Sequence, residues 1–139
     1  MAGKPFHLSI VAPDHSVVEE DVVSVVAPGR QGYFGVWAGH MPMIAALKAG
    51  LLEYETPSGD RHYVTVSGGF AEVQGDRVVV LADAAERAQE IDVERAQRAL
   101  ENARKALRGE VSGVTPVEAV QEMERAVNRL RAAQRIGKA

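Results

Sequence analysis

The chain has 139 residues, of which 46% are hydrophobic and 25% are charged. These proportions are typical of a folded domain with its own core, and they exclude a largely disordered chain. Cysteine is absent, which excludes disulfides, thiolate metal sites and cysteine nucleophiles. No segment approaches the roughly 20 apolar residues that a membrane span needs, so we expect any association with a membrane to be indirect, through partner proteins.

The net charge of -3 is distributed unevenly along the chain. Residues 1–87 carry 6 basic and 11 acidic side chains, whereas residues 88–139 carry 10 basic and 8 acidic ones. The basic side chains of the second part are mixed with Glu, and no aromatic side chain is present there to stack on bases. Nucleic acid is therefore not an expected partner, and an acidic protein surface or an anionic small ligand suits this segment better.

The first part of the chain has the pattern of an antiparallel β domain. Its β-branched runs include 21–26, 61–66 and 77–81, and turn-forming residues stand at 57–60 and 74–76. Many short strands at this spacing are typical of a β-sandwich or barrel. We therefore predict a β domain over residues 1–87.

After residue 87 the apolar residues recur at steps of three and four, which is the period of an α-helix. The expected apolar stripes are Val93, Ala96, Leu100, Ala103 and Leu107 on the first helix, and Val120, Met123, Val127 and Leu130 on the second. Because the seams are narrow and rich in Ala, their packing buries little apolar area, and we expect the helices to be held together weakly.

The ends of both helices are marked in the sequence. Asp92 is a suitable N-cap for the first helix, and Arg108 followed by Gly109 is suited to end it. Thr115, with Pro and Glu one and three residues later, predicts a capping box at the start of the second helix. The short link over 110–114 folds the helices antiparallel. The predicted fold class is α+β, with a β domain over 1–87 and a helical hairpin over 88–139.

The motifs that would indicate catalysis or a metal site are weak. The four histidines, His7, His15, His40 and His62, lack any ligand spacing. Ser67 lacks a nucleophile elbow and plausible partners, and no carboxylate pair is set in an apolar pocket. We therefore expect neither an enzyme nor a required cofactor.

Aromatic and Met side chains are concentrated in one segment of a chain with only 5% aromatic residues. The segment contains Tyr33, Phe34, Trp37, Met41, Pro42 and Met43. Core filling accounts for such residues in general, and we expect it for Phe34. For so dense a cluster in a segment without helical periodicity, an interface is an equally good interpretation.

Three arginines of the hairpin have two interpretations. Arg125 and Arg129 share one helix face at i, i+4 spacing, and antiparallel packing brings Arg95 toward the same half of the second helix. The guanidiniums then converge on an anion such as a polyphosphate, or they are solvated and paired with Glu94 or Glu122. From spacing alone the second interpretation is favoured, because surface arginines are common.

Four segments together resemble the epsilon subunit of the F-type ATP synthase. They are PGRQGYFGV at 28–36, GHMP at 39–42, VSGGF at 66–70 and VLADAAE at 80–86. The resemblance covers essentially the whole chain. It implies an N-terminal β-sandwich of about ten strands, two C-terminal helices and a non-catalytic place in the central rotor stalk of a proton-translocating enzyme.

This resemblance also implies partners and a location. The sandwich is expected to contact the gamma subunit and the c-ring, and the hairpin to extend along gamma toward the catalytic beta and alpha subunits, where it inhibits ATP hydrolysis. The implied location is peripheral, at the cytoplasmic face of the cell membrane. The implied rotor interface consists of Tyr33, Phe34, Trp37, His40, Met41 and Pro42. Tyr33 and the pair Trp37–Ala38 depart from the residues that many members have, so individual c-ring contacts do not carry over.

Some members of this family bind ATP on the hairpin as a regulatory ligand. The residues that resemble their site are Glu86, Ile91, Asp92, Arg95, Ala96, Arg125 and Arg129. Asn102 stands where a further arginine is expected, which weakens phosphate neutralisation. The alternative to a stalk subunit is a free-standing nucleotide-sensing adaptor, which would purify without gamma.

Overall fold

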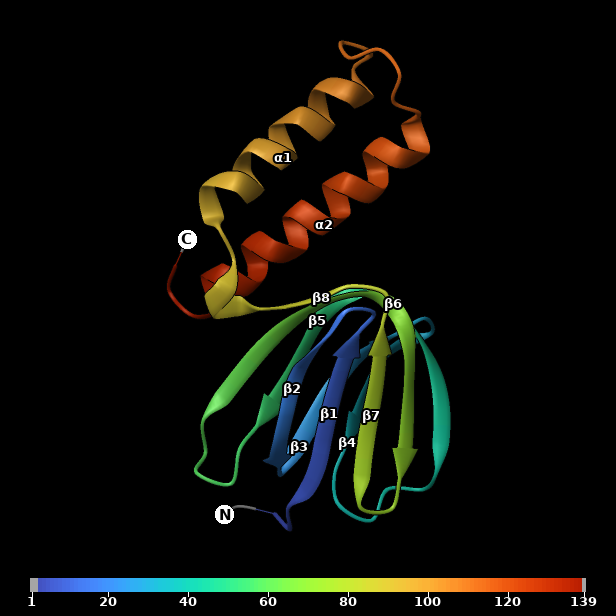
Figure 1. Ribbon diagram of the computed structural model, residues 1–139, viewed down its shortest axis with the longest axis vertical. Helices are drawn as coiled ribbons and strands as arrows, with labels where there is room; N and C mark the ends of the chain where they lie inside the picture. Colours follow the sequence, from blue (N-terminus) through green and yellow to red (C-terminus); the bar gives the residue numbers. More distant parts are fainter. Residues whose placement is uncertain (1–2, 139) are drawn as a thin grey trace. The chain divides into compact units, whose positions relative to one another are not determined.

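The computed structural model describes residues 3–138, and the chain forms two compact units, Met1–Arg87 and Ala88–Ala139 (Figure 1). Strands make up the first unit and helices the second, as the change of apolar period predicts. Within residues 3–138, no helix is both long enough and apolar enough to cross a membrane.

The first unit is a β-sandwich whose described residues form eight strands. They are β1 (Phe6–Ala12), β2 (His15–Val22), β3 (Ser24–Gly29), β4 (Gly32–Val36), β5 (Met43–Glu55), β6 (Arg61–Gln74), β7 (Arg77–Ala82) and β8 (Ala85–Arg87). The strand order is β2-β1-β7-β6-β5-β3-β4, and β8 pairs with the first part of β6. All pairs are antiparallel except β1 with β7, which is parallel.

The strands β5 and β6 form a long hairpin that passes through both layers of the sandwich. In β6 the buried side chains include Val64 and Val66 before Gly68–Gly69, and Ala71 and Val73 after them. The buried face thus changes from even to odd positions, which the positive φ angles of the two glycines (84° and 110°) allow. Each strand therefore serves both layers without a break, and this is why the structure has fewer strands than the expected ten.

The apolar run 21–26, predicted as a strand, is divided between two strands in the structure. β2 ends at Val22, β3 begins at Ser24, and the backbone N–H of Val23 between them donates to the carbonyl of Glu55 at 2.8 Å. Val22, Val23 and Val25 are all buried. When the residues on both sides of a break between two strands are buried, the apolar run looks the same in the sequence as one buried strand.

The core of the sandwich consists of alternating side chains from several strands. Among those with less than 2% exposure are Leu8, Ile10, Leu52, Tyr54, Val64 and Val66. Each fully buried aliphatic side chain stabilises the fold by about 1.5–3 kcal/mol relative to exposure. The hydroxyl of the buried Tyr54 donates to the carboxylate of Glu20, so this core position leaves no polar group unsatisfied. The pKa of Tyr54 is raised mainly by burial of the side chain, and in addition by this hydrogen bond to Glu20.

The second unit contains a short 3-10 helix, η1 (Ala88–Glu90), followed by α1 (Val93–Leu107) and α2 (Pro116–Arg135). Both predicted N-caps are confirmed. The Asp92 carboxylate accepts from the backbone N–H of Arg95 at 3.1 Å, and Thr115 and Glu118 form the reciprocal bonds of a capping box. Gly109, predicted to end α1, follows the C-cap residue Arg108 and has a φ of 78°.

The seam between α1 and α2 is formed by alanines. Its fully buried members are Ala96 and Ala103 on α1, and Ala119, Ala126, Ala132 and Ala133 on α2. The stripe predicted on α2 is wrong in this respect, because Val120 is 38% exposed and the larger apolar side chains lie beside the seam. Alanines at seven-residue spacing let the backbones approach closely and exclude longer side chains from the line of contact.

Candidate functional site

The residues expected at an interface lie on β4 and on the loop that joins it to β5. Trp37 and Met41 are 59% and 79% exposed, and Pro42 is also exposed. His40 is half-buried, and its Nδ1 lies 2.7 Å from the carbonyl oxygen of Met41. Phe34 packs against the core cluster, which is the structural role predicted for it. The loop therefore presents mainly Trp37, Met41 and Pro42 to a partner.

The indole of Trp37 lies directly on the backbone of Gly35. A Cβ atom at Gly35 would come within 2.7 Å of the Trp37 ring, so only glycine permits this approach. The exposed ring is consequently held in place by the strand below it. A large aromatic surface that is fixed before binding loses little conformational entropy on association.

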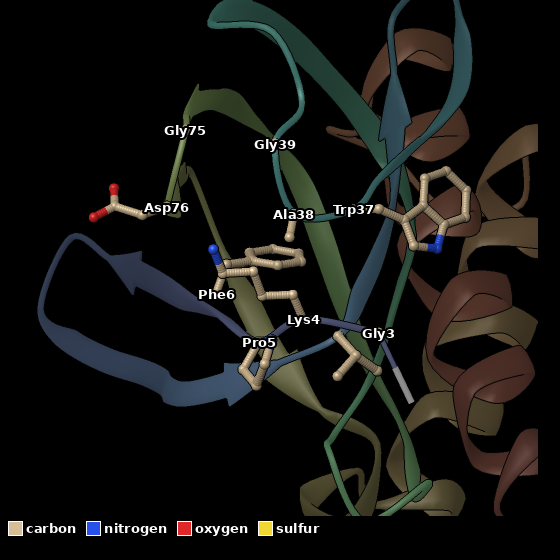
Figure 2. Close-up of a pocket in the computed structure, with 10 residues that line it drawn as sticks. Gly3, Lys4, Pro5, Phe6, Trp37, Ala38, Gly39, Gly75 and Asp76 are labelled. Carbon is tan, nitrogen blue, oxygen red and sulfur yellow. The ribbon is translucent and has the colours of Figure 1, made fainter. Parts of the chain in front are cut away.

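A cavity of about 470 Å³ lies beside Trp37, at the end of the sandwich that contains the start of β1 (Figure 2). Its lining residues are Gly3, Lys4, Pro5, Phe6, Val23, Trp37, Ala38, Gly39, Gly75 and Asp76. In Figure 2 the side chains of Lys4, Phe6 and Ala38 gather around it, with Trp37 on one side and Asp76 on the other. The lining is mostly apolar and backbone, and its charged side chains are Lys4 and Asp76.

An exposed apolar row crosses the outer face of four strands, and the sequence prediction did not include it. Direct cross-strand pairing aligns Ala46 of β5, Phe70 of β6, Leu81 of β7 and Val11 of β1. Phe70 and Leu81 are each 57% exposed, and Ile44, two residues from Ala46, is 73% exposed. Leu81 lies between the buried Val80 and Ala82, whereas Phe70 has the same even numbering as the buried Val64 and Val66, so only the change of face at Gly68–Gly69 places Phe70 on the outer face.

At the end of the strand order formed by β2, the strands β1 and β2 carry a polar cluster around His7. Its Nε2 lies 2.8 Å from a Glu19 carboxylate oxygen, and its Nδ1 lies 3.4 Å from Asp21. The hydrogen bond to Glu19 is the main reason that the pKa of His7 is raised. The pKa of Glu19 is lowered mainly by the hydrogen bond from Ser9, and in addition by the one from His7. Within residues 3–138, no group of three or more His, Asp or Glu side chains could hold a metal ion.

The candidate anion-binding residues lie mostly on the helical hairpin. Arg95 and Arg125 are exposed, and within residues 3–138 neither guanidinium has a carboxylate within ion-pair distance. Pairing with Glu94 or Glu122, the alternative interpretation, is therefore absent from the described part of the chain. Arg129 is half-buried and has a polar partner.

The other residues expected at an ATP site have different surroundings. Ile91 and Ala96 are buried, so they support the hairpin from within. Asp92 uses one carboxylate oxygen as the N-cap of α1. Glu86 is half-buried on β8 of the sandwich and interacts with another group of the protein. Asn102, where the pattern has an arginine, is exposed on α1.

Two family models match the chain, one to each unit. Residues 5–88 match the β-sandwich domain of the ATP synthase delta/epsilon chain, and residues 89–134 match its long α-helix domain. The ATP synthase epsilon chain of Nitratidesulfovibrio vulgaris strain DP4 is 44% identical over 92% of this chain and 95% of its own length. The ATP synthase epsilon chain of Moorella thermoacetica is 43% identical over 91% of this chain and 95% of its own length.

Solved structures of mitochondrial ATP synthases contain chains with the same fold. A chain of the Euglena gracilis complex of OSCP, F1 and c-ring has a TM-score of 0.76 at 28% identity, over 96% of this chain and 84% of that one. A chain from the central stalk and c-ring of the Tetrahymena thermophila enzyme has a TM-score of 0.63 at 12% identity, which shows the fold alone. The chain therefore belongs to the family of ATP synthase delta/epsilon chains, and within it to the epsilon chains, which are non-catalytic subunits of the enzyme.

Proposed function

We propose that this chain joins the gamma subunit to the c-ring in the rotor of a proton-translocating ATP synthase. In this role it lies at the cytoplasmic face of the cell membrane without entering the bilayer. Its helical hairpin inhibits ATP hydrolysis by reaching the catalytic beta and alpha subunits. ATP bound to the hairpin favours the compact, non-inhibitory form.

The observation that carries the rotor role is the exposed apolar row Val11–Leu81–Phe70–Ala46, together with Ile44. Phe70, Leu81 and Ile44 are each more than half exposed, and Val11 and Ala46 are half-buried. Apolar side chains aligned in this way across four strands are typical of a surface that a partner covers. The loop between β4 and β5 adds the exposed Trp37 and Met41 and leads directly into β5, which carries Ile44. The sandwich therefore offers an extended apolar surface to partners.

The seam of the hairpin supports the inhibitory role. Alanine side chains bury much less apolar area than leucine or valine would, so the free energy that keeps α1 against α2 is small. Leu107, Val111 and Val117, around the link between the helices, are each at least 40% exposed. Separation of the helices consequently costs little, and apolar groups are available for a different partner.

The charges of the hairpin support ATP as its ligand. Arg95 and Arg125 are unpaired cations among the described residues, and guanidiniums bind phosphate oxygens through paired donors. ATP stabilises the compact form only to the extent that it binds that form more tightly than the extended one. Because Asn102 stands where a further arginine is expected, we expect ATP to bind more weakly than it would with an arginine at this position.

Co-purification with gamma tests the rotor role. Phe70→Glu combined with Leu81→Glu places two charges in the apolar row, and we expect at least a tenfold loss of gamma binding. Val117→Glu, an exposed apolar position of the hairpin, is the matched control and should retain binding to gamma. A chain that never co-purifies with gamma, with or without these changes, would instead be the free-standing nucleotide sensor.

Two further measurements test the regulation. Removal of residues 88–139 should raise ATP hydrolysis by the reconstituted complex, and unchanged hydrolysis would contradict inhibition by the hairpin.

Calorimetric titration of the chain with ATP should give binding that Arg95→Ala or Arg125→Ala weakens. Arg108→Ala is the control, because this arginine is already paired with Glu101 and Glu110. Absence of binding at millimolar ATP would contradict the ATP site.

A further inference from the structure

The C-terminal end of α2 is closed by a Schellman motif that fixes the position of Lys138. Gly137 has a φ of 76°, its N–H donates to the carbonyl of Gln134, and the N–H of Lys138 donates to the carbonyl of Ala133 at 2.8 Å. This is the pair of hydrogen bonds that defines the motif. The position after the left-handed glycine commonly carries an apolar side chain that packs on the helix, but here it carries a lysine.

The ammonium of Lys138 binds the first residues of the helical unit, far from it in the sequence. Its Nζ donates to the carbonyl of Gln89 at 2.9 Å and to that of Ile91 at 2.7 Å. Gln89 is the middle residue of η1, and Ile91 directly precedes Asp92, the N-cap of α1. Hydrogen bonds with a charged donor are stronger than those between neutral groups, so one side chain fastens the last residues of α2 to the segment that begins the hairpin.

The segment that Lys138 binds contains a single turn of 3-10 helix that packs against α2. η1 is a single turn, closed by the bond from the N–H of Ile91 to the carbonyl of Ala88 at 3.2 Å. Ala88 and Ile91 are buried, and η1 packs against α2. Because a short 3-10 turn has little stability of its own, the contacts made by α2 and Lys138 decide whether this segment stays in place.

We propose that Lys138 is a strap that holds residues 88–91 to the end of α2 and thereby keeps the hairpin closed. Release of the two carbonyls frees the start of α1, so α1 separates from α2 from this end of the seam. The proposal deepens the regulatory role described under "Proposed function" and rests on it for its physiological meaning. The strap itself is a property of the isolated chain.

Hydrogen exchange of the isolated full-length chain tests the strap. Lys138→Ala should speed exchange of the Ile91 N–H by about tenfold, the effect of losing a charge-assisted contact, with no change in β6. Lys138→Arg keeps a cationic donor and should retain most of the protection. Lys105→Ala removes a lysine of the same unit whose side chain forms no hydrogen bond with residues 88–91, and it should leave exchange at Ile91 unchanged.

Each outcome decides the proposal. Equal exchange at Ile91 in the wild-type chain and Lys138→Ala would overturn it, and so would the same acceleration in Lys105→Ala, because the effect would then come from net charge. In the reconstituted enzyme, Lys138→Ala should lower ATP hydrolysis, since the hairpin opens more readily. If removal of residues 88–139 leaves hydrolysis unchanged, the inhibitory function fails while the exchange result still establishes the strap.

Discussion

The hydroxyl oxygen of Tyr33 accepts a hydrogen bond from the backbone N–H of Leu51 at 3.0 Å. The register between β3 and β5 shifts after Val26, where the unshifted ladder would place Pro28 opposite Leu51. Leu51 therefore lacks a strand partner on this side, and the Tyr33 side chain replaces it. Gly50 permits the approach, because a Cβ there would lie 2.4 Å from Pro28 and 2.8 Å from the Tyr33 hydroxyl. Tyr33 thus has a structural role alongside the interface role expected for it.

Tyr33→Phe removes this acceptor while keeping the ring. The Leu51 N–H then loses its protein partner, so we expect the free energy of unfolding of the sandwich to fall by about 1 kcal/mol. Urea denaturation measures the change, and amide exchange locates it. Exchange should accelerate at Leu51 and stay constant at Leu52, which lies opposite Val64 within the β5–β6 ladder. Unchanged exchange at Leu51 would show that the hydroxyl has no structural part.

Gly69→Ala should be among the most damaging single changes in the sandwich. The φ of Gly69 is 110°, and an added Cβ would lie 2.1 Å from the carbonyl oxygen of Leu81 on β7. Backbone strain and the clash together should cost about 3 kcal/mol or more. Gly75→Ala is the control, because that position has ordinary φ and open space around it, and its thermal midpoint should stay close to that of the wild type. A stable, fully folded Gly69→Ala would show that the change of buried face in β6 does not need a glycine at this position.

The local signals in the sequence were sufficient for the helical unit. Caps act over three or four residues, so Asp92, Thr115 and Gly109 could be assigned from neighbours alone. The seam could be assigned only in part. Ala96 and Ala103 of the predicted α1 stripe are buried in it, but α2 has alanines and larger apolar residues on adjacent faces, which offer two possible lines of contact. Close packing selects the alanines, and that choice depends on the partner helix rather than on the periodicity of either helix.

The predictions for the sandwich were limited by contacts between distant residues. The division of 21–26 depends on Glu55, which lies far along the chain and accepts from Val23. Phe70 and Leu81 form a row only because β6 and β7 pair in one register. The contact of Lys138 with Gln89 spans 49 residues. None of these pairings leaves a local pattern. For Arg95 and Arg125, helical spacing alone favoured pairing with Glu94 or Glu122, and neither ion pair is present among residues 3–138.

Ala126→Leu tests whether the alanine seam sets the distance between the helices. Ala126 is 1% exposed on α2, and three more carbon atoms there should force α1 away at a cost of about 1–3 kcal/mol. The control is Val127→Leu, beside the seam, where a half-buried side chain has room to adjust. Far-UV circular dichroism should show loss of helix at lower temperature in Ala126→Leu only, with the β signal retained. Equal melting of both variants would contradict close packing at Ala126.

The pH dependence of the sandwich should follow the pair His7 and Glu19. The folded pKa of His7 is raised above its ordinary value of 6.5, so its stabilising effect is fully present below that value and is lost as the pH rises through the folded pKa. The pKa of Glu19 is lowered from 4.5, so its effect is present above 4.5 and is lost as the pH falls through the folded pKa. The pair therefore contributes most between these two ordinary values.

His7→Asn should remove this dependence while leaving the core intact. Because the His7 side chain is 43% exposed, solvent screens the interaction, and we expect only a small difference in the unfolding midpoint. Urea denaturation at about pH 5.5 and about pH 8 provides the comparison. The wild type should lose its advantage over the variant at the higher pH, where neutral His7 no longer forms an ion pair with Glu19 and Asp21. An advantage that persists or grows at the higher pH would show that the neutral ring, rather than the ion pair, joins β1 to β2.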